Sequence, residues 1–139
     1  KYTNYGTGAA LATSAGVGAG DIIKDGNDTT VAGKIYYSNN GTWTLTDADA
    51  PASSTGLIAV ALGTNSSANG MLLRGMVKLS SDPGGNIGVP IYLADTATGD
   101  GLATSTAPSS GHVVRIIGYN VGATGEIYFN PDHTWVERS

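Results

Sequence analysis

The chain has 139 residues, a formal net charge of −4 and no cysteine. This length corresponds to one domain, which buries enough surface to fold without a metal or a disulfide, and the lack of cysteine argues against disulfide-stapled modules and thiolate metal sites. The seven Lys and Arg residues are scattered and no apolar run approaches the ~20 residues of a membrane span, so neither nucleic-acid binding nor membrane insertion is expected.

The surface is expected to carry few charges. Only 13% of the residues are charged, against about 25% in an average domain. A weakly charged surface is less protected against association, so we expect much of it to lie in an assembly. The 21 glycines leave little room for helices, because glycine disfavours a helix interior by ~1 kcal/mol relative to alanine.

The first twenty residues, Lys1–Gly20, are predicted to form an extended arm ahead of a domain that spans residues 21–139. The arm is too poor in apolar area to form a core of its own, whereas an extended segment can add main-chain hydrogen bonds to an exposed sheet edge. We hypothesise that the arm lies across a neighbouring subunit and contributes to assembly through Tyr2, Tyr5 and Leu11. A tail that packs on its own domain or stays loose is the alternative.

Beyond the arm, short runs rich in Val, Ile, Tyr and Thr alternate with turn residues. Short strands at this spacing indicate an all-β fold, an antiparallel β-sandwich or barrel. The expected strands are Asp21–Lys24, Val31–Tyr37, Thr42–Thr46, Leu57–Leu62, Met71–Leu79, Pro90–Ala94, Val113–Tyr119, Glu126–Phe129 and Thr134–Glu137.

Two apolar runs are expected to be central strands. Residues 56–63 read GLIAVALG and residues 111–118 read GHVVRIIG, each nearly continuous in apolar side chains and closed by glycine. Such runs are typical of strands that are covered on both faces.

One segment occurs twice. GKIYYSNNGTWTL at residues 33–45 aligns without a gap on GEIYFNPDHTWVE at residues 125–137. Asn-Gly favours a type I′ hairpin turn in the first copy, and Pro and Asp suit a type I turn in the second. We therefore predict an internally repeated hairpin, in which aromatic side chains pair across the strands as core structure. These side chains are Tyr36, Trp43, Tyr128 and Trp135.

No catalytic signature is found in the sequence, and no catalytic residue, cofactor or metal site is predicted. His112 begins an apolar strand and His133 lies in the second predicted turn. A catalytic histidine needs an oriented acid partner and a nucleophile. Serines are plentiful, so a triad stays open, but no pattern in the sequence signals one. A glycan hydrolase usually needs two carboxylates. The only local pairs are Asp47 with Asp49, in a loop that enters a proline, and Asp95 with Asp100.

Two acidic loops suggest calcium binding and the aromatic residues suggest sugar binding, but each feature has a simpler interpretation. The loops Asp25–Asp28 and Asp95–Gly101 offer oxygens for calcium, yet neither has EF-hand spacing and both contain ordinary turn formers. Sugars stack on exposed aromatic faces, but most aromatic residues fall at strand positions where packing is expected to bury them. Tyr2, Tyr5 and Tyr119 are less clearly part of the core.

Taken together, several segments resemble a domain of tailed-bacteriophage virion proteins, found in tail-fibre ends and small capsid decoration proteins. The segments are GKIYYSNNGTW, GLIAVALG, GMLLRGMVKL, the Gly-x-Pro-Ile-Tyr-Leu of Gly88–Leu93, HVVRIIGY and IYFNPDHTW, so the resemblance covers about Gly20–Glu137. It carries no catalytic signature and transfers no active site, and it does not account for the arm.

The resemblance implies a β-rich, non-catalytic subunit on the surface of a virion. Its expected partners are copies of itself, with a trimer favoured because phage fibres and decorations are commonly threefold, and other virion proteins such as the major capsid protein. A receptor- or glycan-binding tip of a tail fibre, which would bind a cell-surface glycan, is the alternative. A fibre-borne enzyme is third.

Overall fold

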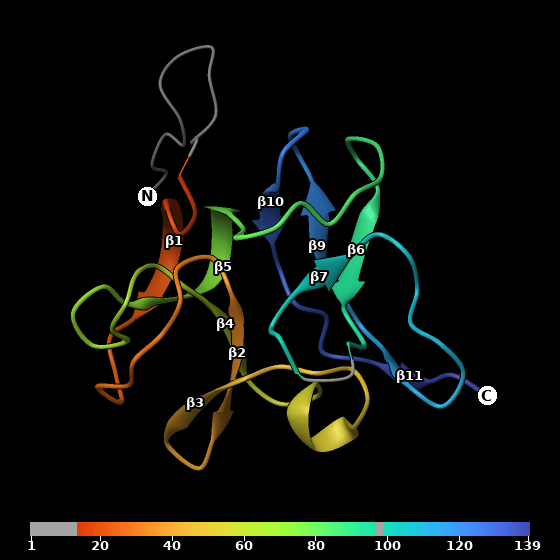
Figure 1. The fold of residues 1–139 in the computed structure, drawn as a ribbon, viewed down its shortest axis with the longest axis horizontal. Helices are drawn as coiled ribbons and strands as arrows, with labels where there is room; N and C mark the ends of the chain where they lie inside the picture. The colour runs from red at the N-terminus through yellow and green to blue at the C-terminus, as the bar shows by residue number, and fades with distance from the viewer. Residues whose placement is uncertain (1–13, 97–98) are drawn as a thin grey trace.

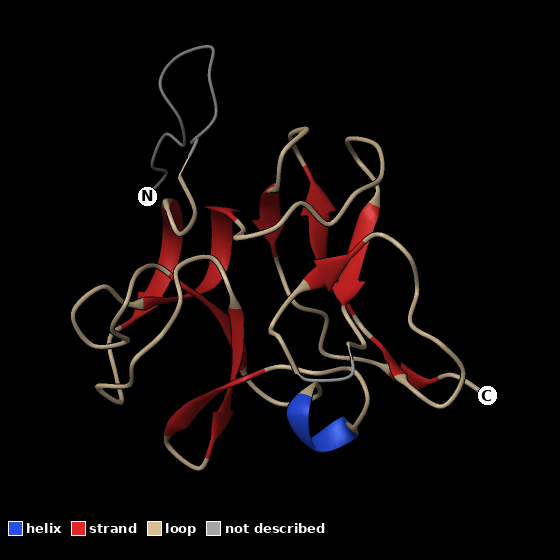
Figure 2. Ribbon diagram, viewed as in Figure 1, coloured by secondary structure: helices blue, strands red, loops and turns tan. Residues whose placement is uncertain are grey.

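The computed structural model describes residues 14–96 and 99–139. Strands dominate this part of the chain (Figures 1 and 2), and its only helical segment is a 3₁₀ turn at Pro51–Ser53. The predicted all-β, antiparallel class is therefore confirmed. The strands are β1 (Gly18–Ile23), β2 (Ile35–Asn39), β3 (Thr42–Leu45), β4 (Ile58–Ala61), β5 (Met71–Lys78), β6 (Pro90–Leu93), β7 (Ala103–Thr104), β8 (Val113–Val114), β9 (Ile116–Asn120), β10 (Glu126–Phe129) and β11 (Val136–Glu137).

Within the described residues, nine strands form one curled sheet in the order β3-β2-β4-β5-β10-β9-β6-β7, with β1 also paired to β5, and β8 and β11 form a small second sheet. Strand β1 runs along one edge of β5. On the other edge, β4 pairs with the first two residues of β5 and β10 pairs with the last four. The sheet therefore divides at β5 into two branches, and in Figure 1 β4, β2 and β3 lie below β5 while β10, β9, β6 and β7 lie to its right. No helix in this part of the chain has the length and apolar character needed to cross a membrane.

The β1–β5 pair requires glycine where the two strands approach most closely. Gly20 lies opposite Gly75. A Cβ atom on either residue would collide with a backbone oxygen of the other strand, Arg74 O in one case and Ala19 O in the other. Both glycines also have positive φ angles, which other residues rarely adopt.

Strand β4 is buried on both faces, as the GLIAVALG run predicts. Ile58 and Val60 belong to the main core, which fills the concave side of the sheet. Ala59 and Ala61 belong to a second cluster on the opposite face. All four residues are at most 2% exposed, so the uninterrupted apolar run reflects two cores that share one strand.

Part of the predicted arm belongs to the domain itself. Strand β1 begins at Gly18, so the predicted boundary at residue 20 falls within a strand, and the Gly16 N–H donates to the Lys78 carbonyl. The end of the segment thus packs on its own sheet. Tyr2, Tyr5 and Leu11 lie outside the described residues.

The first copy of the repeat forms the predicted hairpin, and the second copy does not. Strands β2 and β3 pair directly, and the turn residues Asn40 and Gly41 both have positive φ angles, as a type I′ turn requires. In the second copy, however, β10 pairs with β5 and β9, and β11 pairs with β8. The prediction of an internally repeated hairpin is therefore wrong.

The second copy stays extended because another strand lies beside it. After β10, the N–H groups of Asn130 and Asp132 donate to the carbonyls of Ile117 and Ile116. Pro131, which has no N–H, lies between them. The chain therefore continues along β9 towards β8 instead of folding back on itself.

This difference changes the environment of the matched aromatic residues. Tyr36 and Trp43 are 4% and 6% exposed and lie in the second core cluster. Trp135 is 39% exposed and Tyr128 is partly buried on the outer face of the sheet. The assignment of Trp135 to the aromatic core is wrong, since its segment has no hairpin partner to cover it.

A buried arginine divides the predicted strand Val113–Tyr119 into β8 and β9 and joins the two branches of the sheet. Arg115 is 7% exposed. Its Nη1 donates to the carbonyls of Ser54 and Gly56, just before β4, at 2.8 Å each. Its Nε donates to the carbonyl of Asp132, beyond β10, at 2.9 Å. The guanidinium therefore holds both sides of the division together.

The two tryptophans are expected to differ in their contribution to stability. Trp43→Ala should lower the free energy of unfolding by about 3–5 kcal/mol, because it leaves a cavity in a buried cluster. Trp135→Ala should lower it by less than about 1 kcal/mol, because the side chain faces solvent. Urea unfolding of both variants measures the difference. Equal losses of unfolding free energy would contradict the assignment of Trp43 to the core and of Trp135 to the surface.

Candidate functional site

The outer face of the sheet carries a row of uncharged side chains in register across five strands. Ala19 of β1 lies opposite Met76 of β5, and Met76 lies opposite Tyr128 of β10. Tyr128 in turn lies opposite Tyr119 of β9, and Tyr119 opposite Pro90 of β6. We call these five residues the outer row.

The alternation of burial along the strands shows that the outer row points away from the core. The next residues along three of the strands, Val77, Ile127 and Ile91, are fully buried in the main core. Because successive side chains point to opposite faces, the row lies on the convex side. Tyr119 is 42% exposed and the other four are partly buried.

Charges near the outer row are already paired. On one side, the Lys78 ammonium lies 3.3 Å from the Glu126 carboxylate, and both side chains are largely buried. On the other side, Arg74 lies 3.3 Å from Asp21 in an exposed ion pair. The open face of an antiparallel sheet is usually polar, so the uncharged, partly aromatic outer row differs from the usual composition of such a face.

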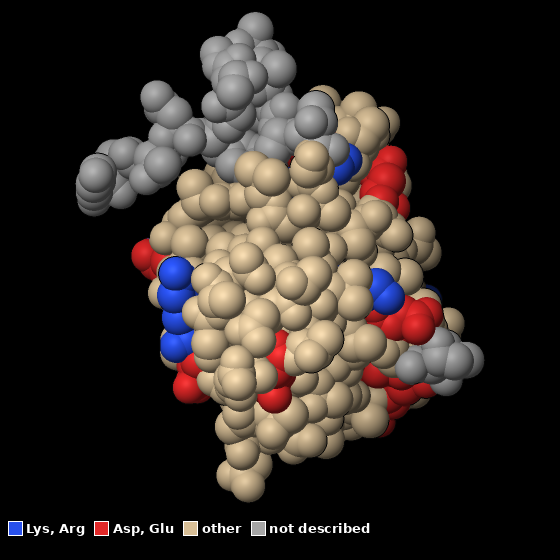
Figure 3. Space-filling model, turned by 60° about the vertical axis from the view of Figure 1, so that its left-hand side comes forward, with Lys and Arg blue, Asp and Glu red and all other residues tan. Residues whose placement is uncertain are grey.

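The wider surface on the β1 side of the molecule is also weakly charged. Figure 3 shows a broad central area without Lys, Arg, Asp or Glu, with most charged atoms towards the margins of the view. This agrees with the low content of charged residues in the sequence.

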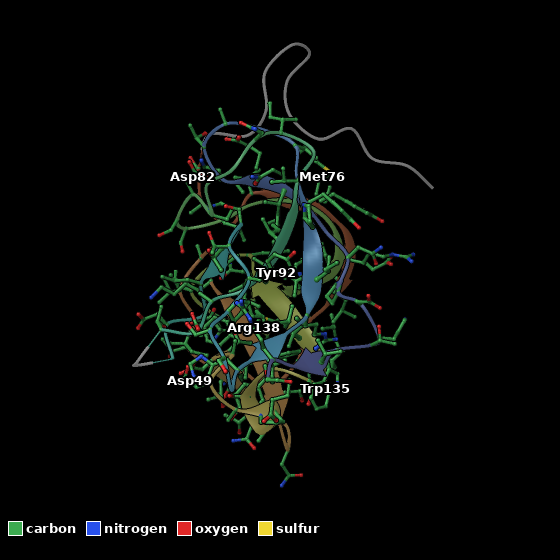
Figure 4. The ribbon with its side chains drawn as sticks, turned by 90° about the vertical axis from the view of Figure 1, so that its right-hand side faces the viewer. Asp49, Met76, Asp82, Tyr92, Trp135 and Arg138 are labelled. Atoms are coloured by element: carbon green, nitrogen blue, oxygen red, sulfur yellow. The ribbon has the colours of Figure 1, made fainter. Side chains whose placement is uncertain are left out.

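A separate aromatic groove lies beside the small sheet. The groove has a volume of about 270 Å³ and is lined by Tyr92 and Trp135, by the carboxylate-bearing Asp132, and by apolar residues of β8, β9 and β11. In Figure 4, Trp135 lies near one end of the molecule and Met76 near the other, so the groove and the outer row are distinct.

Asp132 is held as an anion at the edge of the groove. Its Oδ1 accepts hydrogen bonds from the Thr134 backbone N–H at 3.1 Å and from the Thr134 hydroxyl at 3.2 Å. These bonds lower the pKa of Asp132 below its ordinary value. The groove thus combines two aromatic rings with a fixed hydrogen-bond acceptor.

His112 lies in a cluster of acidic groups that sequence reasoning did not assemble. Its Nδ1 is 2.7 Å from Asp95 Oδ2 and 3.6 Å from Asp49 Oδ1. The hydrogen bond to Asp95, with Asp49 and Asp47 nearby, raises the pKa of His112. No pattern in the sequence links these residues, because they come from three separate loops.

Asp95 anchors this cluster. Its carboxylate accepts the Ser109 N–H at 2.8 Å as well as the bond from His112. These bonds lower the pKa of Asp95 to about 2. The His112–Asp95 pair thus joins two loops that lie 17 residues apart in the chain.

Two of the carboxylates singled out in the sequence accept backbone hydrogen bonds. Asp28 Oδ2 accepts the Trp43 N–H at 2.9 Å, and Asp47 Oδ1 accepts the Asp49 N–H at 3.0 Å. Among residues 14–96 and 99–139, no three His, Asp or Glu side chains group in a way that could hold a metal ion. His133 lines a cleft between β4 and β10.

No protein-family model, curated protein or solved structure matches the chain.

The His112–Asp95 pair should make stability depend on pH. A raised pKa in the folded state means that protonated His112 stabilises the fold below its unfolded pKa, and that this contribution is lost as the pH rises through the folded value. His112→Gln should therefore destabilise the protein more at about pH 5 than at about pH 9, as measured by urea unfolding.

Asp95→Asn is the matched variant from the other side of the pair. It should reduce the same pH dependence, and the double variant should add little to either single change. Equal destabilisation by His112→Gln at both pH values would show that the ion pair does not contribute.

Proposed function

We propose that the protein is a non-catalytic structural subunit of a tailed-phage virion, which assembles in many copies through the outer row. The observation that carries this proposal is the uncharged row across five strands, in which the Tyr119 side chain is exposed to solvent. Tyrosine and methionine are enriched at protein interfaces, because they provide contact area without a full charge to desolvate.

Two further features support the proposal. The sequence resembles domains of capsid decoration and tail-fibre proteins from about Gly20 to Glu137, and its low charge suits a surface covered by neighbours. The proposed partners are copies of the chain, with a trimer favoured, and other virion proteins such as the major capsid protein. The proposed location is the surface of the virion.

A charge placed in the outer row should prevent assembly without unfolding the domain. In Tyr119→Glu and Met76→Lys, association would bury an unpaired charge, which is strongly unfavourable. We expect the unchanged protein to form oligomers in light scattering at high concentration, and both variants to remain monomeric with the same circular dichroism spectrum.

Ile87→Glu provides the matched control. Ile87 is 67% exposed and lies outside the outer row. Ile87→Glu therefore adds the same negative charge as Tyr119→Glu at a different surface position and should assemble normally. A monomeric unchanged protein at all concentrations, or equal loss of assembly in all three variants, would rule out the outer row as the interface.

Glycan binding at the aromatic groove is the second candidate function. It is favoured by one observation, the exposed Trp135 beside Tyr92 and ionised Asp132. A sugar ring can pack its apolar face on an aromatic ring while its hydroxyls donate to a carboxylate. Such a site would suit a receptor-binding tip.

Trp135→Ala tests the groove. If the groove binds glycans, a glycan identified on an array with the unchanged protein should bind this variant at least about tenfold more weakly in calorimetry, a loss of about 1.4 kcal/mol. Tyr119→Glu is the control, since it changes an exposed aromatic residue outside the groove. Unchanged affinity in Trp135→Ala would exclude this site.

A further inference from the structure

A cleft opens where the two branches of the sheet separate. It has a volume of about 500 Å³ and lies between β4 and β10. Leu57, Leu73 and Pro131 supply apolar walls, and Arg74, Arg115 and His133 supply basic groups. Its size falls within the range of small-molecule sites, which are mostly apolar with a few placed polar groups.

The cleft is basic although the protein is acidic. The side chains that line it include two arginines and a histidine but no Asp or Glu, whereas the whole chain has a net charge of −4. Arg74 is neutralised by Asp21 at the surface. Arg115 forms no ion pair with any described Asp or Glu.

The guanidinium of Arg115 has one nitrogen to spare. A guanidinium carries five N–H donors, and the three bonds to the carbonyls of Ser54, Gly56 and Asp132 use Nε and Nη1. Nη2 bonds no described residue. Nη2 is also accessible to solvent. Among the described residues, the only fully buried side-chain nitrogen or oxygen without a hydrogen-bond partner is Asn120 Oδ1, so the unpartnered Nη2 is not fully buried.

Arg115 is a buried cation that is hydrogen-bonded but not ion-paired. It is 7% exposed, and burial lowers its pKa, an effect that the charge of Asp132 partly offsets. Its three hydrogen bonds to carbonyls satisfy Nε and Nη1. An anion in the cleft would add an ion pair at Nη2.

We propose that this cleft binds a small ligand with a carboxylate group, which accepts hydrogen bonds from Nη2 of Arg115 while the body of the ligand contacts Leu57, Leu73 and Pro131. A carboxylate carries one charge and matches the two remaining donors. A phosphate carries up to two charges and more acceptor oxygens, and therefore requires more donors than Nη2 offers.

The carboxylate can belong to a sugar acid or to an amino acid, and matched probes separate these sources. Titrations of the full ¹⁵N-labelled chain, followed by amide chemical shifts, would use D-glucuronate against neutral D-glucose, and N-acetyl-leucine against its neutral amide. We expect saturable shifts at residues of the cleft with at least one carboxylate and not with its neutral counterpart. Inorganic phosphate is the competing anion.

Two variants test the assignment of the residues. Leu73→Trp should fill the cleft and abolish the saturable shifts while Arg115 stays in place. Arg115→Lys keeps the charge but loses the fixed geometry, and should weaken binding by at least about tenfold. Arg115 also joins the two branches, so its replacement affects folding as well as binding. If Arg115→Lys does not fold, Leu73→Trp still decides the test, because it leaves Arg115 in place.

Arg74→Gln is the control for charge. It removes a positive charge at the rim of the cleft and should weaken binding much less than Arg115→Lys. The proposal is overturned if neither carboxylate binds saturably, if the neutral counterparts cause the same shifts, if phosphate binds and the carboxylates do not, or if Arg74→Gln has the larger effect.

Discussion

The curled sheet depends on one buried cation. Strands β4 and β10 share a single edge of β5 and then diverge. Arg115 donates to carbonyls from both sides, at Ser54 and Gly56 before β4 and at Asp132 beyond β10. A neutral side chain has fewer donors than this geometry requires, and an ammonium lacks the fixed planar fork.

The same division positions the two openings at which ligand binding is proposed. The extended chain beyond β10 contributes to two openings: Asn130, Pro131 and His133 line the cleft, whereas Asp132, Thr134 and Trp135 line the aromatic groove. Met76 of the outer row lies towards the other end of the molecule from Trp135 (Figure 4). One irregular segment thus separates two sites of different chemistry, one basic and one aromatic.

The candidate sites were less predictable than the strands. The exposure of Trp135 was missed, because its match to Trp43 placed both in a core. The group of His112, Asp95 and Asp49 was also missed, since its members lie in separate loops. The sequence leaves Tyr119 less clearly part of the core than the other strand aromatics, but its alignment with Tyr128 and Met76 depends on the pairing of non-consecutive strands.

The sequence by itself determined the class of fold, the positions of most strands, the burial of β4 on both faces and the hairpin at Asn40 and Gly41, because apolar periodicity and turn chemistry act over a few residues. Only the tertiary structure decided what happens to the second copy of the repeat. Its turn residues permit a hairpin, but Asn130 and Asp132 donate to β9 instead. Pairing between distant strands satisfies backbone groups that no local pattern assigns, and it therefore decides which side chains are buried and which stay free to bind.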